Sequence, residues 1–467
     1  MMNRLQWEKL LSEDRIRKSS GKSDGKYVTR NQFEADYDRI VGSSSVRRLQ
    51  DKAQVFPLQK NDVVRTRLTH SIEVSAIARS LAKSVGLELE NRGEFDRKKT
   101  EQLMGMLQTA GLIHDLGNPP FGHYGETVIR NWYRDNVLKQ NAEQKSERQE
   151  DTDFLFFDGN VQNLRILTKL QTMNDEYGVN FTYGTLASII KYPYASNHSK
   201  HKKNKFGYFK SEEDIVKDIW AHTGLGEGIR HPAAYLLEAA DDITYLCDDI
   251  EDGVKKGYVP WEKEFEKLFT KLKDNEEYIN LLNIIKGKEP DKNLDKNERL
   301  LAKVRVFRNY VQGHLIKTAI ESFFDNYDAI MDGTYGLHEL LESDKRLTDA
   351  LKGITVEYCF SCDEVLTLEV VGERVICELL NIFYKAISRQ DQETIKNTSN
   401  YEGKIYHLIS DNYKYIAQFD YKKHGCRILN DVDEYDRIHL IIDFISGMTD
   451  SYAVSLYKKL LGISLPA

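Results

Sequence analysis

The sequence is poor in the residues that mark several classes of protein. It has five cysteines among 467 residues, without an even framework of spacings, so a secreted fold held by disulfides is excluded and a reducing cytosol is expected. Cys359 and Cys362 form one C-x-x-C pair. A structural zinc site requires two more ligands at matching spacing, so we interpret these two side chains as ordinary thiols.

Long apolar runs and an excess of positive charge are also absent from the sequence. No run approaches the roughly 20 apolar residues of a membrane span, and residues 1–15 lack the apolar stretch of a signal peptide. We therefore expect no membrane partner and a cytoplasmic location. The formal net charge of −7 argues against a protein that mainly coats nucleic acid, because such binding requires clustered Lys and Arg. A local basic pocket for a phosphorylated small molecule remains compatible with it.

The main pattern in the sequence is helical periodicity. Small and apolar residues recur at helical spacing in His70–Leu87, Glu101–Asp115 and His231–Gly257. The third segment has proline in its first turn and glycine at its end, which are typical helix boundaries. Strand-like alternation is confined to weak candidates between Ile354 and Val371. The sequence predicts a mainly α fold with minor β additions, of a length that favours more than one subregion.

The stretch AGLIHDLGNPPFGHYGE, residues 110–126, gathers ionisable side chains at a predicted helix end. His114 and Asp115 come first, a Gly/Pro turn follows, and His123 and Glu126 come next. Adjacent helical residues point about 100° apart, so His114 and Asp115 converge on one ion only near the end of the helix. A His-Asp dipeptide alone is weak evidence for a metal site.

Acidic residues inside the third apolar segment strengthen the hypothesis of a metal site. Asp241 and Asp242 lie within YLLEAADDITYL, where carboxylates are costly unless they are paired or bound to a cation. Asp241, Tyr245 and Asp249 have the spacing i, i+4, i+8, which places them on one stripe of the helix.

Two histidines and two carboxylates around one divalent ion explain this pattern. His70 begins a separate helical segment and completes such a set with His114. Mixed nitrogen and oxygen ligands suit Mn, Fe, Zn, Ni or Mg. The alternative is that the histidines are core residues and the acids are solvated. This alternative is less favoured when the separate segments are considered together.

The ordered pattern H…HD…D resembles the HD superfamily of metal-dependent phosphohydrolases. A closer resemblance, covering about residues 35 to 457, is to the bacterial dGTPase-like deoxynucleoside triphosphate triphosphohydrolases. It rests on six ordered blocks: ADYDRIVGSSSVRRLQDKAQVFPL (Ala35–Leu58), TRLTHSIEV (Thr66–Val74), HDLGNPPFGHYGE (His114–Glu126), KYPY (Lys191–Tyr194), HPAAYLLEAADDITYLCDDIEDG (His231–Gly253) and GMTDSYAVSLY (Gly447–Tyr457). The resemblance implies an HD-domain helical core.

The resemblance also implies a reaction and its cofactor. A dNTP, with dGTP among the substrates, is split into a deoxynucleoside and intact inorganic triphosphate by attack at the α-phosphorus. One divalent metal ion is expected in each HD site, Mn²⁺ or Mg²⁺ first, with Fe, Ni, Zn or Co as other candidates. The implied catalytic pair is His123 and Glu126. The implied metal ligands are His70, His114, Asp115 and Asp241.

Six further residues are candidates for binding the substrate. Arg67 precedes His70 by one helical turn, and Arg binds phosphate through a bidentate fork. We expect Tyr245 to stack over the sugar and exclude a 2′-hydroxyl, and Asp249 to accept a hydrogen bond from the 3′-hydroxyl. Three more candidates follow from the resemblance alone: Gln54, Lys191 and Tyr192.

The resemblance implies partners that the residues alone do not specify. Members of the family are homo-oligomers, often hexamers, and some require a nucleotide activator or bind single-stranded DNA. The Lys-rich stretch Lys200–Lys210 is the candidate for DNA contact, although such charge runs are usually solvated loops. Arg47 and Arg48 either line a nucleotide or effector site or form ion pairs within the scaffold.

The expected chain organisation has three parts, and two other functions compete with the one that the resemblance implies. We expect an N-terminal segment at 1–34, an HD catalytic core at 35–260 and a C-terminal helical region at 261–467 that completes the pocket and the oligomer contacts. Another HD phosphohydrolase, such as a nucleotidase or a hydrolase of alarmone nucleotides, is the nearest alternative. A non-catalytic nucleotide-sensing or single-strand-binding module is the other, and the presence of all four ligands and the catalytic pair argues against it.

Overall fold

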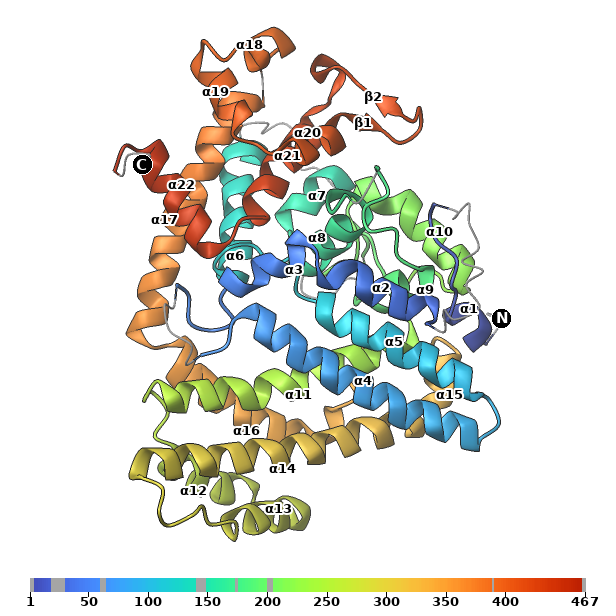
Figure 1. Cartoon of the computed structure of the whole chain (residues 1–467), viewed down its shortest axis with the longest axis vertical. Helices are drawn as coiled ribbons and strands as arrows, with labels where there is room; N and C mark the ends of the chain where they lie inside the picture. The colour runs from blue at the N-terminus through green and yellow to red at the C-terminus, as the bar shows by residue number, and fades with distance from the viewer. Residues whose placement is uncertain are drawn as a thin grey trace.

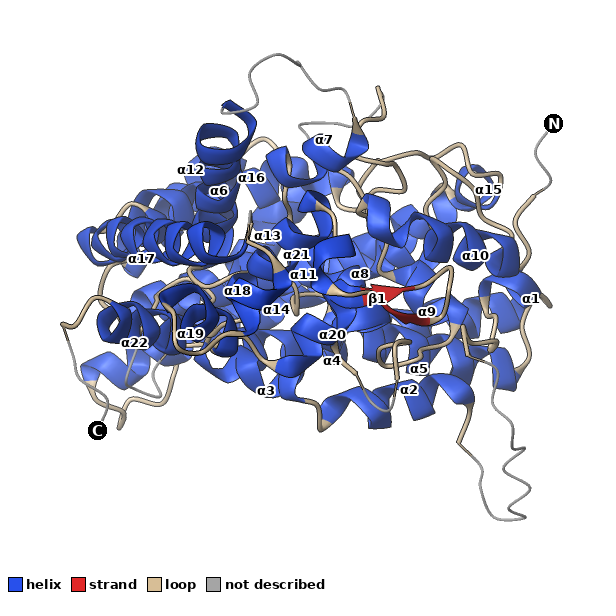
Figure 2. Ribbon diagram, turned by 90° about the horizontal axis from the view of Figure 1, so that it is seen from above, coloured by secondary structure: helices blue, strands red, loops and turns tan. Residues whose placement is uncertain are grey.

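The computed structural model describes residues 4–17, 30–58, 64–139, 148–172, 175–199, 205–388 and 390–463. It is mainly helical (Figures 1 and 2), as the sequence predicts. Within the described residues, none of the helices combines the length and apolar character required to cross a bilayer.

A pair of long helices lies at the centre of the fold (Figure 1). α4 (Arg67–Asn91) and α5 (Arg97–Ile113) pack along their lengths. The side chain of Asp96 accepts a hydrogen bond from the Lys99 amide and begins α5. α5 ends at Ile113, so His114 is its C-cap, and the turn begins before Asp115, earlier than the helical spacing in Glu101–Asp115 indicates.

Three more helices cover this pair. α2 (Gln32–Val41) packs on α5, and α11 (Pro232–Lys255) packs on α4. α14 (Lys296–Asp325) lies against the other side of α11. The bounds of α11 lie close to those predicted, with Pro232 in the first helical position.

The remaining helices extend two hydrophobic cores. The first core includes the helices just described and α16 (Lys345–Thr355). The second lies between α6 (Gly122–Tyr133), α7 (Gln149–Leu155), α17 (Asp363–Ile387), α19 (Tyr401–His407), α20 (Asp411–Gln418), α21 (Glu434–Ser446) and α22 (Asp450–Leu460). The other α-helices are α1 (Trp7–Leu10), α3 (Ser44–Arg48), α8 (Gly159–Arg165), α9 (Tyr183–Ser188), α10 (Glu213–Thr223), α12 (Trp261–Leu272), α13 (Glu276–Lys286), α15 (Tyr327–Met331) and α18 (Gln392–Lys396).

The strand candidates between Ile354 and Val371 are wrong, because this segment is helical. It contains the end of α16, a π-helical turn at Val356–Phe360 and the first part of α17. Its β-branched residues are not alternately buried, because the adjacent Val370 and Val371 are 68% and 37% exposed. Among the described residues, the strands lie elsewhere: β1 (Phe419–Asp420) pairs with β2 (Gly425–Cys426) in an antiparallel hairpin (Figure 2).

Candidate active site

Close packing of α4 against α5 positions two histidines. A Cβ atom added to Gly111 would lie 2.6 Å from the Cα atom of Ser75, so the two helix backbones touch at this point. His70 lies in α4, slightly more than one turn before Ser75, and His114 follows the end of α5. The centroids of the two imidazole rings lie 5.4 Å apart.

Two carboxylates complete the cluster that the sequence predicts. The ligand atoms of His70, His114 and Asp115 all lie within 4.8 Å of one another. Asp241, from the middle of α11, lies with its Oδ1 atom 3.0 Å from His70 Nε2 and 3.5 Å from His114 Nε2. Three helices therefore bring together the four residues predicted as metal ligands.

The His114 side chain is oriented by a hydrogen bond to the backbone. Its Nδ1 atom donates to the carbonyl oxygen of Gly111 at 2.8 Å, which directs the Nε2 atom toward the carboxylates. This Nε2 atom is buried and has no hydrogen-bond partner among the described residues. A ring fixed in this way, with its second nitrogen left available, is the usual arrangement of a metal-binding histidine.

The charges around the cluster favour a cation. Burial alone would lower the pKa of His114, but the carboxylates of Asp115 and Asp241 outweigh it and raise that pKa to about 9. Burial alone would raise the pKa of Asp115, but Arg67 and His114 outweigh it and hold the pKa below its ordinary value. The ionised carboxylates thus create a negative potential at the imidazole nitrogens. The donor set, the buried unpartnered nitrogen and this potential fit a divalent metal ion.

The predicted catalytic pair lies on the first turns of α6. His123 Nδ1 and Glu126 Oε2 are 3.4 Å apart, and this contact raises the pKa of His123. The His123 side chain is 82% exposed, while Glu126 is buried. The second oxygen of Glu126 accepts a hydrogen bond from the Gly159 amide at 2.8 Å. Glu126 is therefore held in place, and His123 is accessible to a substrate.

Two of the six substrate-binding candidates lie next to the cluster. Arg67 is buried and donates from Nη1 to Asp115 Oδ2 at 2.6 Å. Lys191 lines a small pocket together with His114 and Asp241, and its Nζ atom lies 2.9 Å from Glu238 Oε1. Both cations are thus engaged by carboxylates near the place predicted for a triphosphate.

The other four candidates lie on α11, before α4 and beside Lys191. Tyr245 and Asp249 follow Asp241 by one and two turns of α11, half-buried and buried respectively. Gln54 follows Ala53, which forms an isolated bridge with Thr66 at the start of α4, and the buried Oε1 of Gln54 has no partner among the described residues. The ring of Tyr192 lies beneath Lys191, 5.8 Å from its Nζ atom.

Comparison with known proteins shows the family to which this chain belongs. The family described as "HD domain" matches residues 67–150. A "Deoxyguanosinetriphosphate triphosphohydrolase-like protein" of Listeria monocytogenes is 39% identical over 98% of this chain and 100% of its own length. This chain belongs to the deoxyguanosinetriphosphate triphosphohydrolase-like family. Another member, from Pseudomonas aeruginosa, is 34% identical over 99% of this chain and 100% of its own length. A "Deoxyguanosinetriphosphate triphosphohydrolase" of Cronobacter sakazakii is 31% identical over 92% of this chain and 94% of its own length.

Two polar residues that support this triphosphohydrolase-like site were not predicted. Asn118 donates from its side chain to Asp115 Oδ1 and so orients that carboxylate. Asp450 is buried at the start of α22, and its two oxygens accept hydrogen bonds from the amides of Phe121 and Ala53, each at 2.9 Å. The sequence block around Asp450 belongs to the family resemblance, which was the only signal available. Its partners lie more than 300 residues away in the chain.

The turn after Asp115 in this family member is packed so tightly that a methyl group should disrupt it. A Cβ atom at Gly117 would lie 2.0 Å from the Gly159 carbonyl oxygen and 2.3 Å from the Asn163 amide nitrogen. We expect Gly117→Ala to lower the free energy of unfolding by about 1–3 kcal/mol. Turnover should fall on the order of a hundredfold, because a shift of about 1 Å displaces Asp115.

Thermal unfolding and steady-state kinetics would measure both effects. The matched control is Gly42→Ala, because no atom lies within 4 Å of a Cβ atom added there. Wild-type stability and turnover in Gly117→Ala would contradict the prediction.

Proposed function

We propose that this chain hydrolyses deoxynucleoside triphosphates, dGTP among them, to a deoxynucleoside and inorganic triphosphate. The observation that carries the proposal is the cluster of His70, His114, Asp115 and Asp241 beside an accessible histidine–glutamate pair. The names of the relatives in Listeria monocytogenes and Cronobacter sakazakii support the same substrate class.

In this proposal, His70, His114, Asp115 and Asp241 hold one divalent ion, with Mn²⁺ or Mg²⁺ as first candidates. Such an ion, when bound, draws charge from phosphoryl oxygens and lowers the pKa of water.

The catalytic pair acts on the leaving group. His123 donates a proton to the departing 5′-oxygen as general acid, and Glu126 orients the imidazole and keeps it protonated. The anchoring of Glu126 by the Gly159 amide limits the motion of the pair.

Arg67 and Lys191 neutralise the triphosphate tail. Each is engaged by a carboxylate, Asp115 and Glu238 respectively. These ion pairs keep the two cations fixed near the place predicted for the tail, and a substrate phosphate competes with the carboxylates for them.

Two residues of α11 recognise the sugar. Tyr245 closes the space beside the 2′ carbon. Burial, and then the neighbouring carboxylate of Asp252, raises the pKa of Asp249 to about 8. The carboxyl group of Asp249 accepts a hydrogen bond from a 3′-hydroxyl.

Analysis of the products tests the proposed reaction. The purified protein is incubated with each of the four dNTPs and with GTP, singly and in pairs, with Mn²⁺ or Mg²⁺, and the products are resolved by chromatography. We expect deoxynucleoside and intact triphosphate from at least dGTP. Monophosphate plus pyrophosphate, or stepwise loss of phosphate, would indicate another HD phosphohydrolase. Nucleotide binding without turnover under any pairing would favour a sensing module.

Discrimination against ribonucleotides should depend on the ring of Tyr245. We expect Tyr245→Ala to reduce the ratio of kcat/KM for dGTP over GTP by about tenfold or more, because the alanine side chain leaves room for a 2′-hydroxyl. Tyr245→Phe keeps the ring and is the matched control, with a ratio near that of the wild type. Unchanged selectivity in the alanine variant would exclude a steric role for this side chain.

Other implied properties stay predictions. These are the homo-oligomer, the activating nucleotide, the single-stranded DNA partner and the cytoplasmic location. Residues 200–204 of the Lys-rich stretch lie outside the described residues. The division of the chain into a catalytic core and a C-terminal region at residue 260 also stays a prediction. Both hydrophobic cores contain residues from each side of this boundary.

A further inference from the structure

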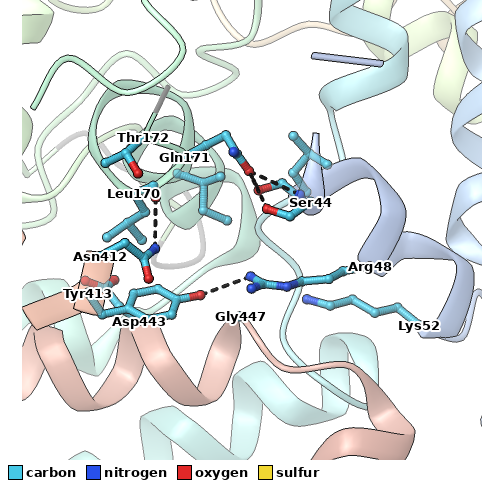
Figure 3. A pocket seen from close by; sticks show the side chains of 13 residues that line it. Ser44, Arg48, Lys52, Leu170, Gln171, Thr172, Asn412, Tyr413, Asp443 and Gly447 are labelled. Carbon is cyan, nitrogen blue, oxygen red and sulfur yellow. Dashed lines mark hydrogen bonds between the residues drawn. The ribbon is translucent and has the colours of Figure 1, made fainter. Parts of the chain in front are cut away.

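A second polar cavity lies next to the turn that carries Asp115. Figure 3 shows the side chains that line this cavity. It has a volume of about 200 Å³ and lies between the α3 segment, the π-helical turn at Ile166–Leu170 and helices α20 and α21. None of the four candidate metal ligands lines it, but Leu116, the residue after Asp115, does. The cavity is thus separate from the metal centre and adjacent to it.

Arg48 brings a positive charge to this cavity without a neutralising partner. Its guanidinium donates to the Tyr413 hydroxyl at 3.1 Å, and no carboxylate of the described residues forms an ion pair with it. The side chain is half-buried, and Figure 3 shows it extending into the cavity toward the Tyr413 ring. Most of the donor capacity of its fork is therefore available to a ligand.

Lys52 brings a buried amino group to the same wall, and burial lowers the pKa of this group to about 7. It is 3% exposed, and its Nζ atom donates to the carbonyl oxygens of Asn118 and Ser446. Figure 3 shows its side chain running beside that of Arg48. Within the described residues no carboxylate forms an ion pair with Lys52, so neither of the two basic side chains that line this cavity has a paired anion.

Two hydroxyl groups also line the cavity. Ser44 and Ser45 both donate to Gln171 Oε1, at 3.1 and 2.6 Å, and these hydroxyls can rotate toward a ligand. Asp443 is the one acidic residue in the lining. Its carboxylate is already bound by Arg165 and by the Gln162 side chain, so its charge is compensated.

We propose that this cavity is a binding site for a phosphate-bearing anion, distinct from the catalytic centre. An Arg fork, an amino group and two hydroxyls are the donors that recognise phosphate oxygens. The volume of about 200 Å³ lies below the roughly 300–1,000 Å³ of pockets that enclose whole drug-sized ligands, so it suits a phosphate chain better than a complete nucleotide.

The site goes beyond the proposed reaction, because an anion bound there would contact a residue that supports the turn carrying Asp115. Lys52 lines the cavity and also binds the Asn118 carbonyl, while the Asn118 side chain binds Asp115. The ligand comes either from inorganic polyphosphate, including the triphosphate product, or from the tail of a nucleotide.

Calorimetric titration tests the site without turnover. Pyrophosphate, inorganic triphosphate and dGTP are each titrated into the full chain in the presence of a chelator, so that neither metal nor hydrolysis contributes. Three variants are compared with the wild type: Arg48→Ala, Ser44→Asp, which adds a carboxylate to the cavity wall, and Arg47→Ala. Arg47 is the matched control, because it is exposed and donates to the Gly42 carbonyl of the neighbouring turn. Thermal unfolding checks that each variant folds.

We expect saturable binding of triphosphate to the wild type. Affinity should fall on the order of tenfold to a hundredfold in Arg48→Ala and in Ser44→Asp, and stay within about twofold in Arg47→Ala. Tighter Arg48-dependent binding of dGTP than of triphosphate assigns the site to a nucleotide tail, and the reverse order assigns it to inorganic polyphosphate. No saturable binding of any probe, or equal affinities in the wild type, Arg48→Ala and Ser44→Asp, would overturn the proposal.

Discussion

Replacing His114 by alanine is expected to reduce turnover of deoxynucleoside triphosphates by about a thousandfold or more and to remove the bound metal. The side chain supplies one of four ligand groups, and its Nε2 atom is buried without another partner in the described part of the chain. Loss of a metal that contributes several kcal/mol to the transition state, about 4 kcal/mol or more, corresponds to this factor. Metal content by mass spectrometry and kcat by chromatography of the products would measure both effects.

The matched control is His338→Ala. His338 is exposed and pairs with Glu342 at the surface, so its removal should leave metal content and kcat near the wild-type values. If His114→Ala retained one metal ion per chain and turned over normally, the assignment of this histidine as a ligand would be wrong.

Replacing His123 by alanine should lower kcat by about 10²–10⁴-fold while leaving metal content unchanged. This is the usual contribution of a positioned general acid, and His123 is not one of the four ligand candidates. Tyr124→Phe is the neighbouring control, because Tyr124 is directed to Glu373 rather than to the cluster. Equal loss of metal and activity in His123→Ala would instead indicate that His123 binds the ion.

The pH dependence separates the role of Glu126 from that of His123. The contact with the Glu126 carboxylate raises the pKa of His123, so the acid form of the imidazole persists to higher pH. In Glu126→Gln that pKa falls, and we expect the alkaline limb of the kcat profile to move to lower pH. The amide oxygen still accepts from the Gly159 amide, so stability should change little. An unshifted alkaline limb would show that Glu126 does not act through His123.

The sequence predicts helices and ligands where the physical signal is local. α11 was predicted from apolar spacing with proline in its first turn and a glycine near its end, and its bounds agree closely. Asp241 was singled out because a carboxylate in an apolar run requires a partner, and the structure places it beside His70 and His114.

Features that depend on distant contacts were not predictable in the same way. The strand candidates failed because β-branched residues such as Val370 lie on the exposed face of a helix that is buried on its other side. Lys52 and Asp450 act on the site through hydrogen bonds to residues far away in the chain, Asn118 and Phe121 respectively. A single sequence carries no spacing that reports such bonds.

The buried carboxylate of Asp450 affects how truncating mutations near the end of the gene should be interpreted. It binds the amide of Phe121, in the turn between Asp115 and His123, and the amide of Ala53, next to Gln54. A nonsense or frameshift allele ending just before codon 450 would keep every candidate ligand and catalytic residue, yet leave both amides without their acceptor. Such an allele should be scored as damaging, although a map of the coding sequence would show the whole HD region intact.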